Sequence, residues 1–149
     1  MLHRLTHHLK YLPLAAAIAM AGGCAATSDS AKPNASLTNT YWKLTQLDGA
    51  PVAMAPQQER EVRITLTDDG KVTGFTGCNR VMGGYTLAGT TLRFTQLAGT
   101  RMACPPPLMQ LESAVLANLN SVTGYQLEGE KLILLKDGAP VARFESVYL

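Results

Sequence analysis

The sequence predicts a mainly β domain with one helix, an α+β fold in which a curved, half-barrel-like antiparallel sheet of about seven or eight strands packs against one α-helix. Three observations support this prediction. Short apolar segments alternate with the period of a half-buried strand, turn residues separate them, and a single segment has helical spacing. Strands joined by tight turns pair antiparallel, and one helix covers one face of such a sheet.

The first predicted strands lie between residues 41 and 67. Residues 41–47 form an apolar stretch that ends at an Asp-Gly-Ala-Pro turn. Residues 61–67 alternate strictly between apolar and polar, which places Val62, Ile64 and Leu66 on one face of a strand.

Two hairpins and a meander follow. An Asp-Asp-Gly turn after residue 67 leads into a returning strand at 71–75, and a second hairpin joins residues 83–87 to 91–94. Toward the end of the chain, the meander is predicted from segments 125–127, 131–136 and 141–147.

One segment has the period of a helix instead. Apolar residues recur there at every third or fourth position, namely Leu108, Leu111, Val115, Leu119 and Val122. They predict an amphipathic helix over residues 109–122. Three prolines precede it, where a missing N–H group costs nothing, and Gly124 is placed to end it.

The N-terminal segment is typical of a bacterial secretory signal. A basic start precedes the apolar run 11–21, and small residues lead directly into Cys24. A cysteine at this place resembles the lipobox of bacterial lipoproteins, so residues 1–23 are predicted to be a signal peptide and Cys24 to be lipidated. The alternative is an ordinary leader cut nearby, for example after Ala26. The run is too short for a retained transmembrane helix.

The remaining chain divides into a tether and a domain. Residues 24–38 hold the predicted lipidated cysteine and a flexible tether rich in Ala, Ser, Thr, Asp and Asn, and residues 39–149 form the domain. Ala25 follows the cysteine where some sorted lipoproteins carry aspartate. By that resemblance we expect the bacterial outer membrane, on its periplasmic side, with the lipid anchor at Cys24 as the membrane contact.

Charge and histidine content exclude several classes of function. The three histidines lie in the leader, and Arg4 and Lys10 leave with it, so eleven basic and eleven acidic residues remain. A neutral chain without a run of basic residues has no positively charged region that would bind the phosphates of a nucleic acid. Without histidine there is no Ser-His-Asp or Cys-His site, and the commonest zinc ligand is missing. We therefore expect a monomer that is not an enzyme, with no catalytic residue, cofactor or metal.

Two segments carry a family resemblance. They are Gly77-Cys78-Asn79-Arg80 with Gly84-Tyr85, and Thr100-Arg101-Met102-Ala103-Cys104; Tyr41–Leu44 and Leu47–Gly49 add to them. Together they resemble the META domain, the family of HslJ-like heat-shock lipoproteins, over nearly the whole mature chain. The resemblance implies a curved antiparallel sheet against a helix and no established enzyme activity. It also implies a role in tolerating heat or envelope stress.

Cys78 and Cys104 are the only cysteines besides the one predicted to be lipidated. The bacterial envelope is oxidising, so we expect a disulfide between them. It would close a loop of about 27 residues and stabilise the domain by about 3.5 kcal/mol on the chain-entropy model. The alternative is two buried free thiols that behave as small hydrophobic side chains.

Residues near these cysteines are the candidate binding residues: Asn79, Arg80, Tyr85, Arg101 and Met102. Arginine binds carboxylates and phosphates bidentately, so one interpretation is an anion site lined by Arg80, Tyr85 and Arg101. In the alternative, these three residues hold the structure by hydrogen-bonding loop carbonyls or by pairing with Glu112 on the predicted helix.

Three classes of function remain open. The first is a non-catalytic domain that binds an unknown envelope protein and supports stress tolerance. The second is a carrier of an apolar or lipid-like ligand, which requires a deep cavity between sheet and helix lined by residues such as Leu92, Phe94 and Leu116. The third is an inhibitor of an envelope enzyme, for which the segment Cys104–Leu108 is the candidate loop.

Overall fold

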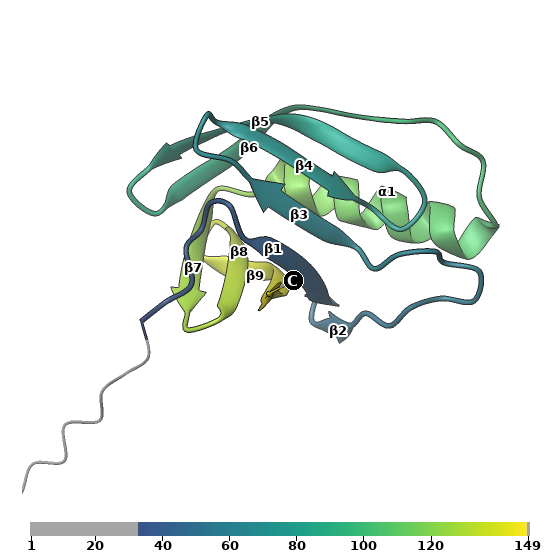
Figure 1. Ribbon diagram of the computed structural model, residues 1–149, viewed down its shortest axis with the longest axis horizontal. Helices are drawn as coiled ribbons and strands as arrows, with labels where there is room; N and C mark the ends of the chain where they lie inside the picture. Colours follow the sequence, from purple (N-terminus) through teal and green to yellow (C-terminus); the bar gives the residue numbers. More distant parts are fainter. Residues whose placement is uncertain (1–32, 149) are drawn as a thin grey trace, which may run out of the picture. The chain divides into compact units, whose positions relative to one another are not determined.

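Nine antiparallel strands and one helix form the part of the chain that the computed structural model describes, residues 33–148 (Figure 1). The elements are β1 (Tyr41–Leu47), β2 (Ala50–Pro51), β3 (Arg63–Leu66), β4 (Lys71–Phe75), β5 (Arg80–Ala88), β6 (Thr91–Gly99), α1 (Pro106–Ser121), β7 (Gly124–Glu128), β8 (Lys131–Lys136) and β9 (Ala139–Val147). The predicted class, mainly β with one helix, is confirmed.

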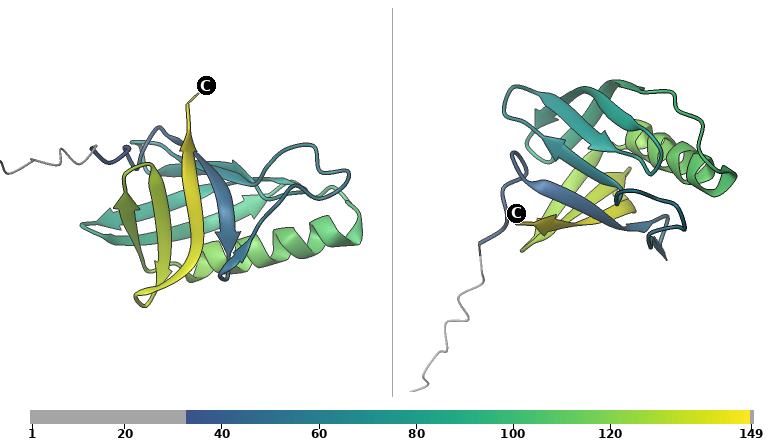
Figure 2. Two further views of the ribbon diagram at one scale, coloured as in Figure 1. Left: turned by 90° about the horizontal axis from the view of Figure 1, so that it is seen from below. Right: turned by 45° about the vertical axis from the view of Figure 1, so that its right-hand side comes forward.

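The strands form one curved sheet in the order β2-β1-β3-β4-β5-β6-β7-β8-β9. Strand β1 also pairs with β9, so the sheet curls round on itself. Between β6 and β7 the only paired position is Thr91 with Gly124, because the two strands diverge beyond it. The sheet is therefore strongly curved without being a regular barrel (Figure 2).

Helix α1 packs against β6 and contributes Leu108, Val115 and Leu119 to the interior, as the spacing predicted. It starts at Pro106, three residues before the predicted start at 109. Proline is compatible with the first turn of a helix, because the N–H groups there have no intrahelical partner. Pro106 and Pro107 thus lie in the first turn of the helix, and Pro105 alone precedes it.

The space between the sheet and the helix is filled by side chains. Trp42, Leu92 and Phe144 are at most 1% exposed, and they belong to one hydrophobic cluster that also includes residues of α1. The indole N–H of Trp42 donates a hydrogen bond to the carbonyl of Leu37 at 2.9 Å, so this buried polar group is satisfied.

The folded part begins before the predicted domain boundary at residue 39. Leu37 is only 7% exposed, and the N–H of Ala35 donates to the carbonyl of Gly129 at 2.7 Å. Asn34 accepts a hydrogen bond from the N–H of the same glycine. Residues 34–38 were assigned to the tether because they are mostly polar and small, yet their backbone groups and Leu37 attach them to the sheet.

The other predictions for the N-terminal region concern residues outside those described, namely the signal peptide 1–23, the lipidation of Cys24 and the start of the tether. Within residues 33–148, the structure contains no helix with the length and apolar character needed to cross a membrane.

Strands β5 and β6 are longer than the sequence indicated. Their hairpin extends to Arg80 on one side and Gly99 on the other, whereas the alternation predicted only 83–87 and 91–94. A register shift between Met82 and Gly84 interrupts the ladder, and Gln96 has a φ of 51°. Such a bulge breaks the two-residue period that identifies a strand in a sequence. The two-residue strand β2 was not predicted.

Candidate functional site

Two loops and the start of α1 meet at one end of the sheet, on the right of Figure 1. The loop 76–79 joins β4 to β5, and the loop 100–105 joins β6 to α1. A disulfide between Cys78 and Cys104 links the two loops, as predicted, with 6.0 Å between the Cα atoms. We call this region, residues 76–80, 100–105 and the first two turns of α1, the disulfide end.

Asn79 connects the two loops through its side chain, which is buried, as its exposure of 2% shows. Its carbonyl oxygen Oδ1 accepts hydrogen bonds from the Thr100 hydroxyl at 3.0 Å and from the Met102 N–H at 2.7 Å. Its amide Nδ2 donates to the Met102 carbonyl at 3.2 Å. Asn79 is therefore a structural residue of this end and is not free to bind a ligand.

Glu112, on the second turn of α1, holds the helix to the same loop. Its carboxylate accepts hydrogen bonds from the Asn79 N–H at 2.8 Å, from Asn79 Nδ2 at 3.0 Å and from the Thr76 hydroxyl at 2.6 Å. The alternative in which an arginine pairs with Glu112 is wrong, because neutral N–H and O–H donors occupy this carboxylate. Thr76 and Thr100 were not identified from the sequence.

Arg80, Arg101 and Met102 are exposed at the disulfide end. Their backbones are fixed next to one another, because the Arg80 N–H donates to the Thr100 hydroxyl and the Thr100 N–H donates to the Arg80 carbonyl, both at 3.1 Å. Met102 keeps 58% of its surface exposed. Within residues 33–148 neither arginine makes an ion pair within 4.0 Å. These three side chains remain available to a partner.

An open pocket of about 390 Å³ lies beside these side chains. Its wall includes Arg80, Thr100 and Met102, and it also includes Arg60 and Phe75, which were not predicted as site residues. Arg60 belongs to the loop before β3, and Phe75 ends β4. Only the strand register brings these positions together, so no local motif in the sequence could identify them.

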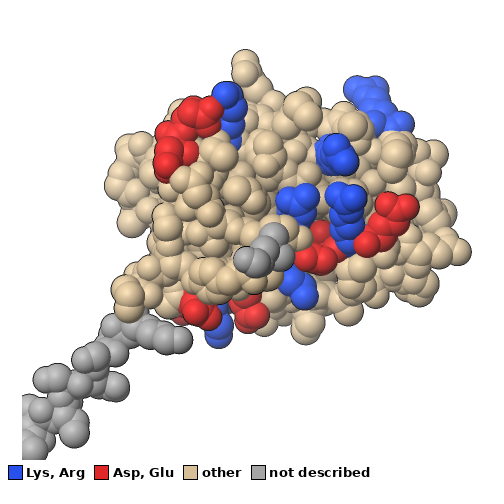
Figure 3. Space-filling model, viewed as in Figure 1, with Lys and Arg blue, Asp and Glu red and all other residues tan. Residues whose placement is uncertain are grey.

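Charged side chains surround the pocket on the sheet side. Figure 3 shows Lys and Arg side chains gathered on this face with Asp and Glu side chains between them. Arg63 lies over the ring of Tyr41 at 5.0 Å, and the Tyr41 hydroxyl donates to Glu61 at 2.6 Å. This hydrogen bond holds the pKa of the Glu61 carboxyl below its usual value, whereas burial and the same carboxylate raise the pKa of Tyr41.

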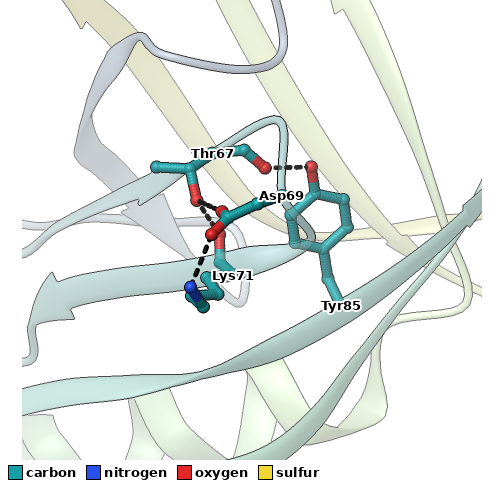
Figure 4. A network of polar contacts seen from close by, with 4 residues as sticks. All are labelled: Thr67, Asp69, Lys71 and Tyr85. Atoms are coloured by element: carbon teal, nitrogen blue, oxygen red, sulfur yellow. Dashed lines mark hydrogen bonds and ion pairs between the residues drawn. The ribbon is translucent and has the colours of Figure 1, made fainter.

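Tyr85 is not part of the disulfide end. Its hydroxyl donates to the Thr67 carbonyl at 2.6 Å, at the turn between β3 and β4 (Figure 4). Burial raises the pKa of Tyr85, while Lys71 and Thr67 lower the pKa of Asp69 in the same turn. Tyr85 thus bonds a loop carbonyl, which agrees with the structural alternative for this residue, and it is separated from the two cysteines by the length of β4.

The features required by the carrier and inhibitor alternatives are not found where they were expected. Leu92 and Phe94 are packed in the hydrophobic cluster, and among the pockets of residues 33–148 described here none is lined by them or by Leu116. The candidate inhibitory loop Cys104–Leu108 is helical from Pro106 onward. No group of three or more Cys, His, Asp or Glu side chains suited to a metal ion occurs in the described part.

Comparisons with known proteins agree with this architecture. The META domain model matches residues 35–148. An NMR structure of a protein from Burkholderia xenovorans is 35% identical and has a TM-score of 0.60, covering 76% of this chain and 85% of that one. A crystal structure of a DUF4847 family protein from Bacteroides vulgatus, 18% identical with a TM-score of 0.56, covers 73% and 93% and shares the fold. No curated protein matched the sequence.

Proposed function

The chain belongs to the META domain family, and on this premise we propose that it is an HslJ-like envelope lipoprotein whose META domain binds a partner protein without catalysing a reaction. In this proposal, partner binding supports tolerance of heat or envelope stress. The stress role rests on the resemblance of the Gly-Cys-Asn-Arg and Thr-Arg-Met-Ala-Cys segments to that group of lipoproteins.

One observation carries the proposal: buried polar groups hold the loops of the disulfide end together, while Arg80, Arg101 and Met102 are exposed there and, within residues 33–148, neither arginine forms an ion pair. The backbone that carries these side chains is already held by hydrogen bonds to Thr100, so a partner that binds there does not have to order a loop. Arginine and methionine are enriched at protein interfaces, whereas most surface charges are lysine, glutamate or aspartate.

The structural observations favour a partner protein over an apolar ligand. The interior is filled by side chains such as Trp42 and Phe144, and a carrier would need that volume to be empty. A catalytic role is also disfavoured, because Thr100 and Glu112 are both hydrogen-bonded to Asn79 and none of these three side chains is poised for a reacting atom.

The membrane anchor in this proposal is Cys24, at the periplasmic side of the outer membrane. Several acyl chains at about 0.8 kcal/mol per buried methylene would anchor the protein stably, where one chain binds reversibly. Intact mass of protein purified from membranes tests the anchor. A diacylglycerol and acyl adduct on a chain that starts at Cys24 is expected, and an unmodified chain that starts after Ala26 would refute it.

Site-specific photo-cross-linking in living cells tests partner binding. A photoreactive amino acid in place of Met102 is expected to yield one discrete cross-linked protein species. The amount of this species should increase after heat shock. The matched control is Leu87, which is 45% exposed but lies near the far end of β5. Identical products from both positions, or no product from Met102, would contradict the proposal.

A further inference from the structure

We propose that the pocket over Phe75 binds a peptide segment in which a carboxylate lies next to an apolar side chain. This inference rests on the proposed function, because it gives the chemistry of the partner segment that the disulfide end would recognise. It follows from three properties of the pocket: an apolar floor, arginines at the rim, and glutamates that lie beside these arginines.

The floor of the pocket is apolar. In β4, Val72 and Gly74 face the interior, where a Cβ on Gly74 would contact the side chains of Ile64 and Val81. Phe75 follows and faces the opposite side of the sheet, outside the hydrophobic core cluster. It is nevertheless only 9% exposed, because the pocket wall around it includes Met102 and the disulfide. An aromatic ring thus forms a sheltered apolar surface on the outer face.

Two arginines line the pocket with this ring, and a third is its register neighbour on β3. The register places Arg63 opposite Phe75 on β3 and Arg80 opposite it on β5. Arg60 lines the same pocket from the loop before β3. Within the described residues none of the three forms an ion pair within 4.0 Å. Guanidinium groups placed around an apolar floor fit a carboxylate attached to a hydrophobic group, because the charge and the ring are bound together.

The mixed charge of the rim favours a peptide over a membrane surface. Glu59 lines the pocket, and Glu61 lies two residues further along the chain. A uniformly anionic lipid surface would bring many negative charges against both carboxylates, whereas a peptide can present a single carboxylate to the arginines. The volume of about 390 Å³ suits one side chain and its neighbouring charge.

Backbone amide chemical shifts of the folded chain, titrated with short peptides, test the inference. The probe is the acetylated, amidated tetrapeptide Ala-Phe-Asp-Ala, and its matched control is Ala-Phe-Asn-Ala, which has the same shape without the charge. We expect saturable shifts at Phe75, Arg80 and Thr100 for the first peptide. The neutral peptide is expected to bind about tenfold more weakly, as loss of one charge-assisted contact implies.

Variants assign the effect to the pocket. Arg80→Gln is expected to weaken binding of the acidic peptide about tenfold and to abolish the difference between the two peptides. Arg93→Gln is the matched control, because Arg93 is an exposed arginine on β6 that does not line the pocket. Equal affinity for both peptides, or binding that Arg80→Gln leaves unchanged, would overturn the inference.

Two further outcomes separate this inference from other accounts. Vesicles of phosphatidylglycerol that displace the acidic peptide and shift the same amides would assign the pocket to lipid and overturn the inference. If Met102 still cross-links its partner when Arg80 is glutamine, and no peptide binds, the inference fails while the proposed function stands. Charge-dependent peptide binding without any cross-linked partner would support the pocket and contradict the proposed function.

Discussion

Replacing Asn79 by alanine should destabilise the domain more than any other single change of an uncharged polar residue at the disulfide end. The change removes four hydrogen bonds between the side chain and oxygen or nitrogen partners, one of them to the Glu112 carboxylate, and a weaker one from Nδ2 to Cys78 Sγ at 3.3 Å. A bond to a charged group contributes about 1.5–3 kcal/mol and each neutral bond about 1 kcal/mol. Because bonds that share one side chain are not additive, Asn79→Ala is expected to cost about 4 kcal/mol of unfolding free energy, less than the sum of these contributions.

Urea unfolding followed by tryptophan fluorescence measures this loss, since Trp42 is the single tryptophan and is buried. With a slope of about 2 kcal/mol per molar urea, the midpoint should fall by about 2 M. Asn120→Ala is the matched control, because that exposed side chain bonds only a carbonyl of its own helix. A loss for Asn79→Ala as small as that of the control would refute the role of Asn79 as the connection between the loops and the helix.

Three further predictions concern stability and ionisation. Replacing Cys78 and Cys104 together by serine should lower the unfolding free energy by about 3.5 kcal/mol in guanidinium titrations, and a loss below about 1 kcal/mol would contradict the chain-entropy estimate. Tyr41→Phe should raise the pKa of Glu61 toward its ordinary value of 4.5 in a carboxyl-carbon NMR titration, and an unchanged pKa would contradict the hydrogen bond. Because the folded pKa of Glu61 is lowered, its stabilising effect is complete above the unfolded pKa and is lost as the pH falls through the folded pKa. Gly74→Ala should destabilise the domain by at least about 2 kcal/mol in urea titrations, because its Cβ would clash with the backbone carbonyl oxygen of Arg63 on β3, and wild-type stability would contradict this packing.

The elements with strong periodic patterns were predictable from the sequence. Strand β1 has the predicted limits 41–47, and the buried side of α1 was found from its apolar spacing. The ends of β5 and β6 were missed because a bulge near Gln96 and the adjacent glycines conceal the alternation. The attachment of residues 34–38 was missed because it depends on backbone hydrogen bonds to a distant turn, which leave no local signal.

The candidate site was only partly predictable for the same physical reason. The disulfide between Cys78 and Cys104 was predicted because only these two cysteines remain beside Cys24 and the predicted location, the bacterial envelope, is oxidising. The structure contains this disulfide. The bond between Asn79 and Glu112 spans 33 positions, so the sequence left open which donor would meet the carboxylate. The sequence predicted a strand over 71–75 without assigning a face to Phe75, and the register and burial of the folded chain place this residue on the outer face.

Survival of heat shock tests the central claim most directly, in a strain that lacks this protein and carries a plasmid-borne copy. The claim predicts that Arg80→Ala, Arg101→Ala and Met102→Ala together abolish rescue, although the variant folds and reaches wild-type levels in the membrane. A control with Lys71→Ala and Leu87→Ala, two exposed positions away from the disulfide end, should rescue fully. Full rescue by the triple variant would contradict a partner-binding role for the disulfide end.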